Sequence, residues 1–103
     1  MTGEIYRYSF QDPVPIAEVR YSFDLAVLAA EGVHGRAQVV LDAGFYLDEE
    51  ARACVVDATT PVGKTVSQIL TALLTFEFGE AVFTVERLDA AEHPSPARAR
   101  SAR

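Results

Sequence analysis

The segment most suggestive of chemistry covers residues 58–65, which read A-T-T-P-V-G-K-T and end in Gly-Lys-Thr. It lies between a predicted strand and a predicted helix. Phosphate-binding loops occur at such places, because their glycines let backbone N–H groups surround a phosphate. Ala58, however, stands where the first glycine of such a loop belongs, and Pro61 removes one N–H group. We therefore interpret the segment as a hydroxyl-capped helix start and keep nucleotide binding as the third functional hypothesis.

Potential metal ligands and nucleophiles are few and scattered along the chain. His34 and His93 are the only histidines and Cys54 is the only cysteine, so no disulfide within the chain and no thiolate metal cluster can form. The acidic run at residues 48–50 lacks the spaced ligands and the glycine bend of a calcium loop. We expect a solvated acidic turn, a buried structural thiol at Cys54, and no catalytic residue, metal or cofactor.

The charge and the distribution of apolar residues narrow the class of partner. A formal net charge of −6 disfavours nucleic-acid binding, which depends on neutralising phosphates, and it disfavours anionic membrane surfaces for the same reason. The first residues do not resemble a secretion signal, and no apolar stretch approaches the roughly 18 residues that a membrane span needs. We therefore expect a cytoplasmic protein that binds neither nucleic acid nor a membrane.

In the first half of the chain, the spacing of apolar residues changes from that of a strand to that of a helix. Alternation over residues 4–10 predicts a strand, and residues from Pro15 onward follow the spacing of a helix. Asp12 is the expected N-cap of this helix, and Gly32 or Gly35 is its expected end.

The second half repeats this order after a hairpin. Residues 36–58 are expected to form two strands joined by the acidic turn at residues 48–50, or by an alternative turn at residues 42–44. Thr60 and Pro61 then begin a second helix, which Gly79 ends. Alternation resumes at Ala81 and predicts the last strand.

This order of elements predicts a ferredoxin-like split β-α-β fold, βαββαβ, with a four-stranded antiparallel sheet and two helices on one face. We expect one α+β domain over residues 1–88. Residues 89–103 contain no large apolar residue, and we expect them to form a flexible tail that contains proline and arginine.

Both helices carry more apolar residues than one buried face requires. The expected core stripe of the first helix is Ile16, Val19, Phe23, Ala26, Val27 and Ala30. That of the second helix is Val62, Val66, Ile69, Leu73 and Phe76. The uncovered sheet face is expected to carry Ile5, Val40, Tyr46 and Val82 among polar residues.

The surplus apolar residues form the candidate interaction site, which consists of Tyr21, Leu25, Leu28, Leu74 and Phe78. Tyr21, Leu25 and Leu28 point away from the expected core of the first helix, where a surface helix normally carries charge. Packing of the two helices against each other would bury part of this surplus. Exposed contiguous apolar area usually marks a partner site. The sequence therefore favours a small non-catalytic protein-association module, a homo-oligomer or a subunit of a larger assembly with a protein partner.

The alternative hypothesis is a ligand-binding or enzymatic ferredoxin-like domain with a pocket on the open sheet face at a subunit interface. Its first candidate residues are Tyr6, Tyr8, Tyr46 and His34.

Overall fold

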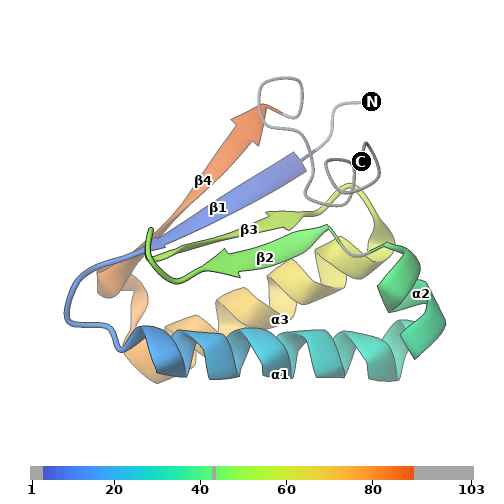
Figure 1. The fold of residues 1–103 in the computed structure, drawn as a ribbon, viewed down its shortest axis with the longest axis horizontal. Coiled ribbons are helices and arrows are strands. Elements are labelled where there is room, and N and C mark those ends of the chain that lie inside the picture. Colours follow the sequence, from blue (N-terminus) through green and yellow to red (C-terminus); the bar gives the residue numbers. More distant parts are fainter. Residues whose placement is uncertain (1–3, 43, 90–103) are drawn as a thin grey trace.

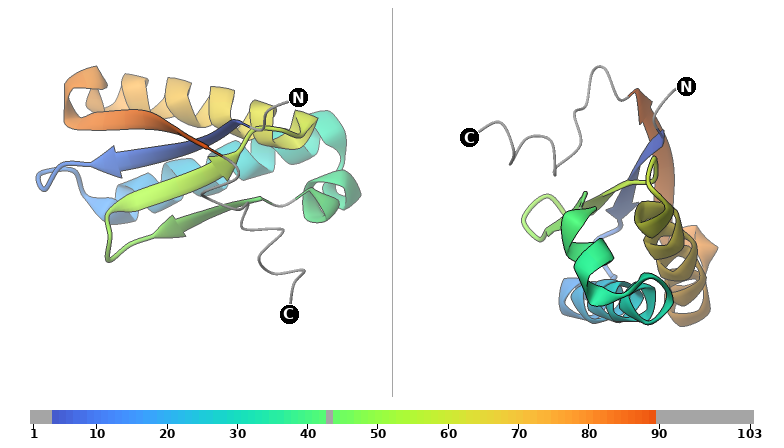
Figure 2. Two further views of the ribbon diagram at one scale, coloured as in Figure 1. Left: turned by 90° about the horizontal axis from the view of Figure 1, so that it is seen from above. Right: turned by 90° about the vertical axis from the view of Figure 1, so that its right-hand side faces the viewer.

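The computed structural model describes residues 4–42 and 44–89. The elements are β1 (Glu4–Phe10), α1 (Ile16–His34), α2 (Arg36–Leu41), β2 (Phe45–Asp48), β3 (Ala53–Asp57), α3 (Pro61–Phe78), the 3-10 turn η1 (Glu80–Val82) and β4 (Phe83–Asp89). The strands form one antiparallel sheet in the order β2-β3-β1-β4. α1 and α3 lie side by side on one face of this sheet (Figure 1, Figure 2).

The α+β class and the four-stranded antiparallel sheet are confirmed, but the predicted ferredoxin-like βαββαβ order is wrong. Within residues 4–42 and 44–89 the chain forms three helices and a 3-10 turn, in the order β α α β β α η β. The extra helix, α2, occupies residues 36–41, where the first strand of the hairpin was expected. The expected tail lies outside the described residues, apart from Asp89 at the end of β4.

Residues 36–41 are helical because apolar and polar residues alternate there over only a few positions, and because the composition favours a helix. Ala37, Val39 and Leu41 alternate, but only Val39 is buried, which a single helical turn achieves as well as a strand. Arginine, alanine, glutamine and leucine are good helix formers. Gly35, with φ 89°, ends α1 and allows the chain to begin a new helix at once. Val40 therefore lies on α2 and not on the open sheet face.

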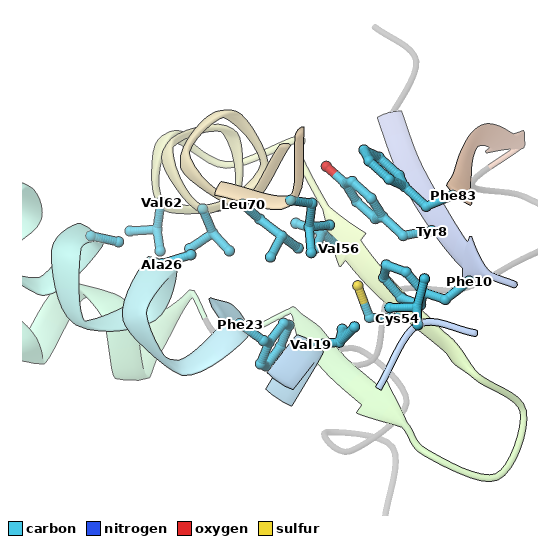
Figure 3. Packing of buried hydrophobic residues seen from close by; sticks show 14 of the residues in the cluster. Tyr8, Phe10, Val19, Phe23, Ala26, Cys54, Val56, Val62, Leu70 and Phe83 are labelled. Atoms are coloured by element: carbon cyan, nitrogen blue, oxygen red, sulfur yellow. The ribbon is translucent and has the colours of Figure 1, made fainter. Parts of the chain in front are cut away.

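The core fills the layer between the sheet and the two long helices (Figure 3). Tyr8, Phe10 and Phe83 enter it from the sheet, and Val19 and Phe23 enter it from α1. The predicted stripe of α1 is confirmed, with Ile16 and Val27 at its half-buried margin; the fully packed members are Val19, Phe23, Ala26 and Ala30.

The predicted core stripe of α3 is wrong in its second half. The buried apolar residues are Val62, Val66, Leu70 and Leu74, whereas Ile69 and Leu73 are half-buried and Phe76 is exposed. Steps of four residues advance the buried face by about 40° per step around a helix. By the last turn this drift places Leu74 in the core and leaves Phe76 outside it.

The predicted N-cap of α3 is confirmed, whereas the predicted N-cap of α1 is wrong. Thr60 caps α3 by accepting a hydrogen bond from the Gly63 N–H at 3.0 Å, with Pro61 at the first helical position. Asp12 does not cap α1, which begins after Pro15 without a side-chain cap.

The segment before α1 is held by Arg52 instead. This residue has φ 53°, and its guanidinium donates to the carbonyl oxygens of Gln11, Asp12 and Val14. The arginine thus satisfies backbone acceptors that no helix or strand uses.

Candidate functional site

The two long helices, α1 and α3, expose large apolar side chains. We define the outer helical face by four residues, with their exposed fractions: Tyr21 (66%), Leu25 (36%), Leu28 (62%) and Phe76 (88%). Residues spaced by four and three lie on one side of a helix, so Tyr21, Leu25 and Leu28 form a stripe on α1. This stripe lies opposite Val19 and Ala30, which are completely buried.

Two of the predicted interaction residues lie elsewhere in α3. Leu74 is completely buried, so its side chain belongs to the core of this chain and is not available to a partner. Phe78 is half-buried and packs against the core. Phe76, which the sequence placed in the core, is the exposed aromatic residue of α3. The drift of the buried stripe along α3 is the signal that would have distinguished these residues.

Charged residues flank the outer helical face on α1. The Arg20 guanidinium lies 4.0 Å from the Asp24 carboxylate and 3.1 Å from the Glu49 carboxylate. All three side chains are well exposed, and such ion pairs contribute about 0–1 kcal/mol each to stability. Their contribution here is mainly a polar border around the apolar stripe.

A groove of about 660 Å³ opens between α3 and the strands β1 and β4. Tyr6, Tyr8 and Val85 line its sheet side, and Lys64 and Thr71 line its helix side. A second hollow of about 440 Å³ shares Thr71 and Val85 with it. The two hollows therefore follow one another along the seam between α3 and β4.

Hydrogen bonds hold the two tyrosines of the groove. Tyr8 Oη lies 2.9 Å from Ser67 Oγ and 2.8 Å from Thr71 Oγ1. Burial raises the pKa of Tyr8, although the bonds to Ser67 and Thr71 act in the opposite direction. Tyr6 Oη donates to Glu4 Oε1 at 2.7 Å, and chiefly this bond raises the pKa of Tyr6. Both phenols are therefore neutral near pH 7.

The four candidate residues of the alternative hypothesis do not meet at one site. Tyr6 and Tyr8 share the groove, on the face of the sheet that α1 and α3 cover. Tyr46 belongs to the opposite face, because it pairs with Val55, which also pairs with Arg7 of β1. His34 lies at the end of α1, where its Nε2 is 2.7 Å from Thr65 Oγ1.

The segment that resembles a phosphate-binding loop is occupied by its own hydrogen bonds. The N–H groups of Ala58 and Thr59 donate to Glu4 O and Asp57 Oδ1, at 2.7 and 2.9 Å. A Cβ atom on Gly63 would lie 1.8 Å from Asp57 O. Gly63 is therefore required for the close approach of α3 to the end of β3, and this geometry explains its place in the segment.

Cys54 and the acidic turn have structural roles in the fold. The Cys54 sulfur lies among apolar side chains (Figure 3), and burial raises the pKa of its thiol to about 12, so the predicted buried thiol is confirmed. In the acidic turn, Asp48 Oδ1 accepts from the Ala51 N–H. Within residues 4–42 and 44–89, no three histidine, cysteine, aspartate or glutamate side chains gather where they could hold a metal ion.

The helices in the described part of the chain are too short or too polar to cross a membrane. In the comparisons with known proteins, no family model, no curated protein and no solved structure matches the chain.

Proposed function

We propose that this protein is a small non-catalytic association module, a homo-oligomer or a subunit of a larger assembly, and that the outer helical face is its contact surface. The observation that carries the proposal is the exposure of four large apolar side chains on two packed helices, Tyr21, Leu25 and Leu28 on α1 and Phe76 on α3. Surface helices normally place charged residues there. Aromatic side chains are enriched at the centres of protein interfaces, whereas charged side chains are depleted there.

The size of these side chains is consistent with an interface centre. Full burial of a large apolar side chain contributes about 1.5–3 kcal/mol, and association must first offset at least about 4 kcal/mol of lost rotational and translational freedom. Burial of most of the four side chains in one contact would therefore exceed the cost of association, whereas burial of one alone would not. The polar border at Arg20 and Asp24 fits the solvated rim of such a contact.

The test is a charge substitution on the outer helical face with a matched control. Leu25→Asp places a carboxylate at the centre of the stripe, and Val40→Asp makes the same kind of change at an exposed position of α2. Light scattering over a concentration series should give a wild-type mass above the 11.2 kDa of one chain. Leu25→Asp should lose the association that this face mediates, and so have a lower mass than the wild type at the same concentration, with an unchanged circular dichroism spectrum; Val40→Asp should behave as the wild type.

A monomeric wild type would assign the face to a different protein. The same two variants would then be compared in affinity capture, where Leu25→Asp should lose the partner that the wild type and Val40→Asp retain. Equal association of folded Leu25→Asp and wild type would contradict the proposal.

The groove beside α3 supports a second candidate function, the binding of a small molecule. Ligand sites are concave, mostly apolar and furnished with a few polar groups, and the groove offers the ring of Tyr6 with Lys64 and Gln68. A thermal-shift screen tests it, since a ligand at a hundred times its Kd stabilises the folded chain by about 2.7 kcal/mol.

We place the protein in the cytoplasm. The support for this is its single cysteine, a buried thiol, which fits a reducing compartment.

A further inference from the structure

β4 is a long strand at one edge of the sheet. It pairs with β1 over its full length, from Phe83 opposite Phe10 to Asp89 opposite Glu4. No strand among residues 4–42 and 44–89 pairs with its other side, as Figure 1 also shows. The opposite edge, β2, has four residues whereas β4 has seven. Unpaired edges are templates for pairing with another chain.

The register of the sheet identifies which backbone groups of β4 point outward. On one side of β1, the Phe10 N–H donates to Arg52 O at 3.0 Å, so the even-numbered residues of β1 bond toward β3. Because the direction of hydrogen bonding alternates along a strand, the backbone N–H and C=O groups of Arg7 and Ser9 point toward β4. There they face Glu86 and Thr84. The N–H and C=O groups of Phe83, Val85 and Arg87 consequently point away from the sheet.

The side of β4 that faces α3 is only partly covered. Val85 lies next to Tyr8 in the register, yet its side chain is 45% exposed, whereas Tyr8 is completely buried. Val85 also lines both hollows of the groove between α3 and β4. A further strand along β4 would cover Val85 and supply the missing wall of the groove.

Charge restricts how a second copy of β4 can align. Antiparallel pairing about a two-fold axis places one residue opposite itself, and like charges opposite each other are destabilising. Centring on Glu86 or on Arg87 sets two like charges against each other. Centring on Thr84 takes Glu86 past the end of the strand, opposite Val82 in η1.

Centring on Val85 avoids these conflicts. It places Val85 against its own copy, Phe83 opposite the partner's Arg87 and Thr84 opposite the partner's Glu86. Every outward-pointing backbone group of Phe83, Val85 and Arg87 then finds a hydrogen-bonding partner.

We propose that two copies of this chain pair through β4 in this antiparallel register, which joins their sheets and sets both α3 helices on the same face. The partner's strand completes the wall of the groove beside Val85. This contact is separate from the outer helical face and does not rest on it.

The test removes the outward N–H group of Val85. Val85→Pro deletes a donor that β1 does not use, and proline is tolerated on edge strands, whereas Val85→Thr keeps both the N–H group and the branched side chain. Light scattering should give the wild type and Val85→Thr a species of twice the 11.2 kDa chain mass. Val85→Pro should weaken its formation at least about tenfold.

Two further measurements guard against a folding defect and a different occupant. Val85→Lys, which sets two ammonium groups opposite each other at the exposed centre, should weaken pairing without the strain of proline. Amide hydrogen exchange at Val85 should slow as the concentration rises. Dimers of unchanged mass in folded Val85→Pro and Val85→Lys, a wild type that shows no dimer, or protection of Val85 that is independent of concentration would each overturn the proposal. A dimer that Leu25→Asp abolishes and Val85→Pro leaves intact would overturn it and leave the proposed function standing.

Discussion

A matched pair of truncations on α3 tests the assignment of its faces. Leu74 is completely buried and Phe76 is 88% exposed, although only one residue separates them in the sequence. Leu74→Ala removes packed methyl groups and leaves a cavity, which costs about 2.7–5 kcal/mol at buried leucines. Phe76→Ala removes a larger side chain that already contacts water, and substitutions at such surface positions stay within about 0.5 kcal/mol.

The assay is urea unfolding of each variant, followed by circular dichroism at a concentration where the chain is monomeric. For a slope of about 1 kcal/mol per molar urea, typical of small domains, the Leu74→Ala midpoint should fall by at least about 2 M. The Phe76→Ala midpoint should stay close to that of the wild type. If Phe76→Ala cost as much as Leu74→Ala, Phe76 would belong to the core and not to the outer helical face.

Three other substitutions, one of them with a matched control, test the positions of individual groups. Gly63→Ala should destabilise the fold by roughly 3 kcal/mol, because its Cβ would overlap Asp57 O, while Lys64→Ala at the neighbouring exposed position should change the urea midpoint little; equal midpoints would refute the close approach. Tyr8→Phe should lower the free energy of unfolding by about 1–2 kcal/mol, because Ser67 and Thr71 lose a partner, and an unchanged thermal midpoint would contradict that. The Cys54 thiol should stay protonated in the folded chain up to about pH 12 while it ionises near 9.0 in the unfolded chain, so the stability that it contributes is present below pH 9 and declines as the pH rises between these values. Cys54→Ala should therefore show a shallower loss of stability from pH 9 to pH 11 in urea titrations than the wild type, and identical slopes would exclude the burial of the thiol.

The parts of the fold that could be predicted from sequence are those with a strong local signal. Thr60 with Pro61 marks a helix start by its own chemistry, and Gly79, with φ 83°, marks a helix end. In α1, apolar residues recur at helical spacing over several turns, which is enough to predict the buried face of the helix.

The errors occur where the local signal is short or ambiguous. Residues 36–41 satisfy both a strand and a helix pattern, and only the pairing of β2 with β3 decides between them. That choice adds α2 and breaks the predicted ferredoxin-like order. The bonds from Arg52 to Gln11, Asp12 and Val14 join distant parts of the chain, and no spacing in the sequence indicates them.

The exposure of the candidate residues was predictable on α1 and not on α3. Tyr21, Leu25 and Leu28 follow directly from helical spacing against a clear core stripe. On α3, apolar residues surround much more of the helix, so the position of the sheet and of α1 determines which of them are buried. Leu74 and Phe76 exchange roles for that reason.

As the proposed contact surface, the outer helical face should be covered in the assembled state. The most direct test is a comparison of amide and side-chain NMR shifts between the dilute chain and the chain within its assembly. We expect the signals of Tyr21, Leu25, Leu28 and Phe76 to shift together on assembly, while those of the exposed Val40 of α2 do not. Assembly that leaves those four residues unchanged would contradict it.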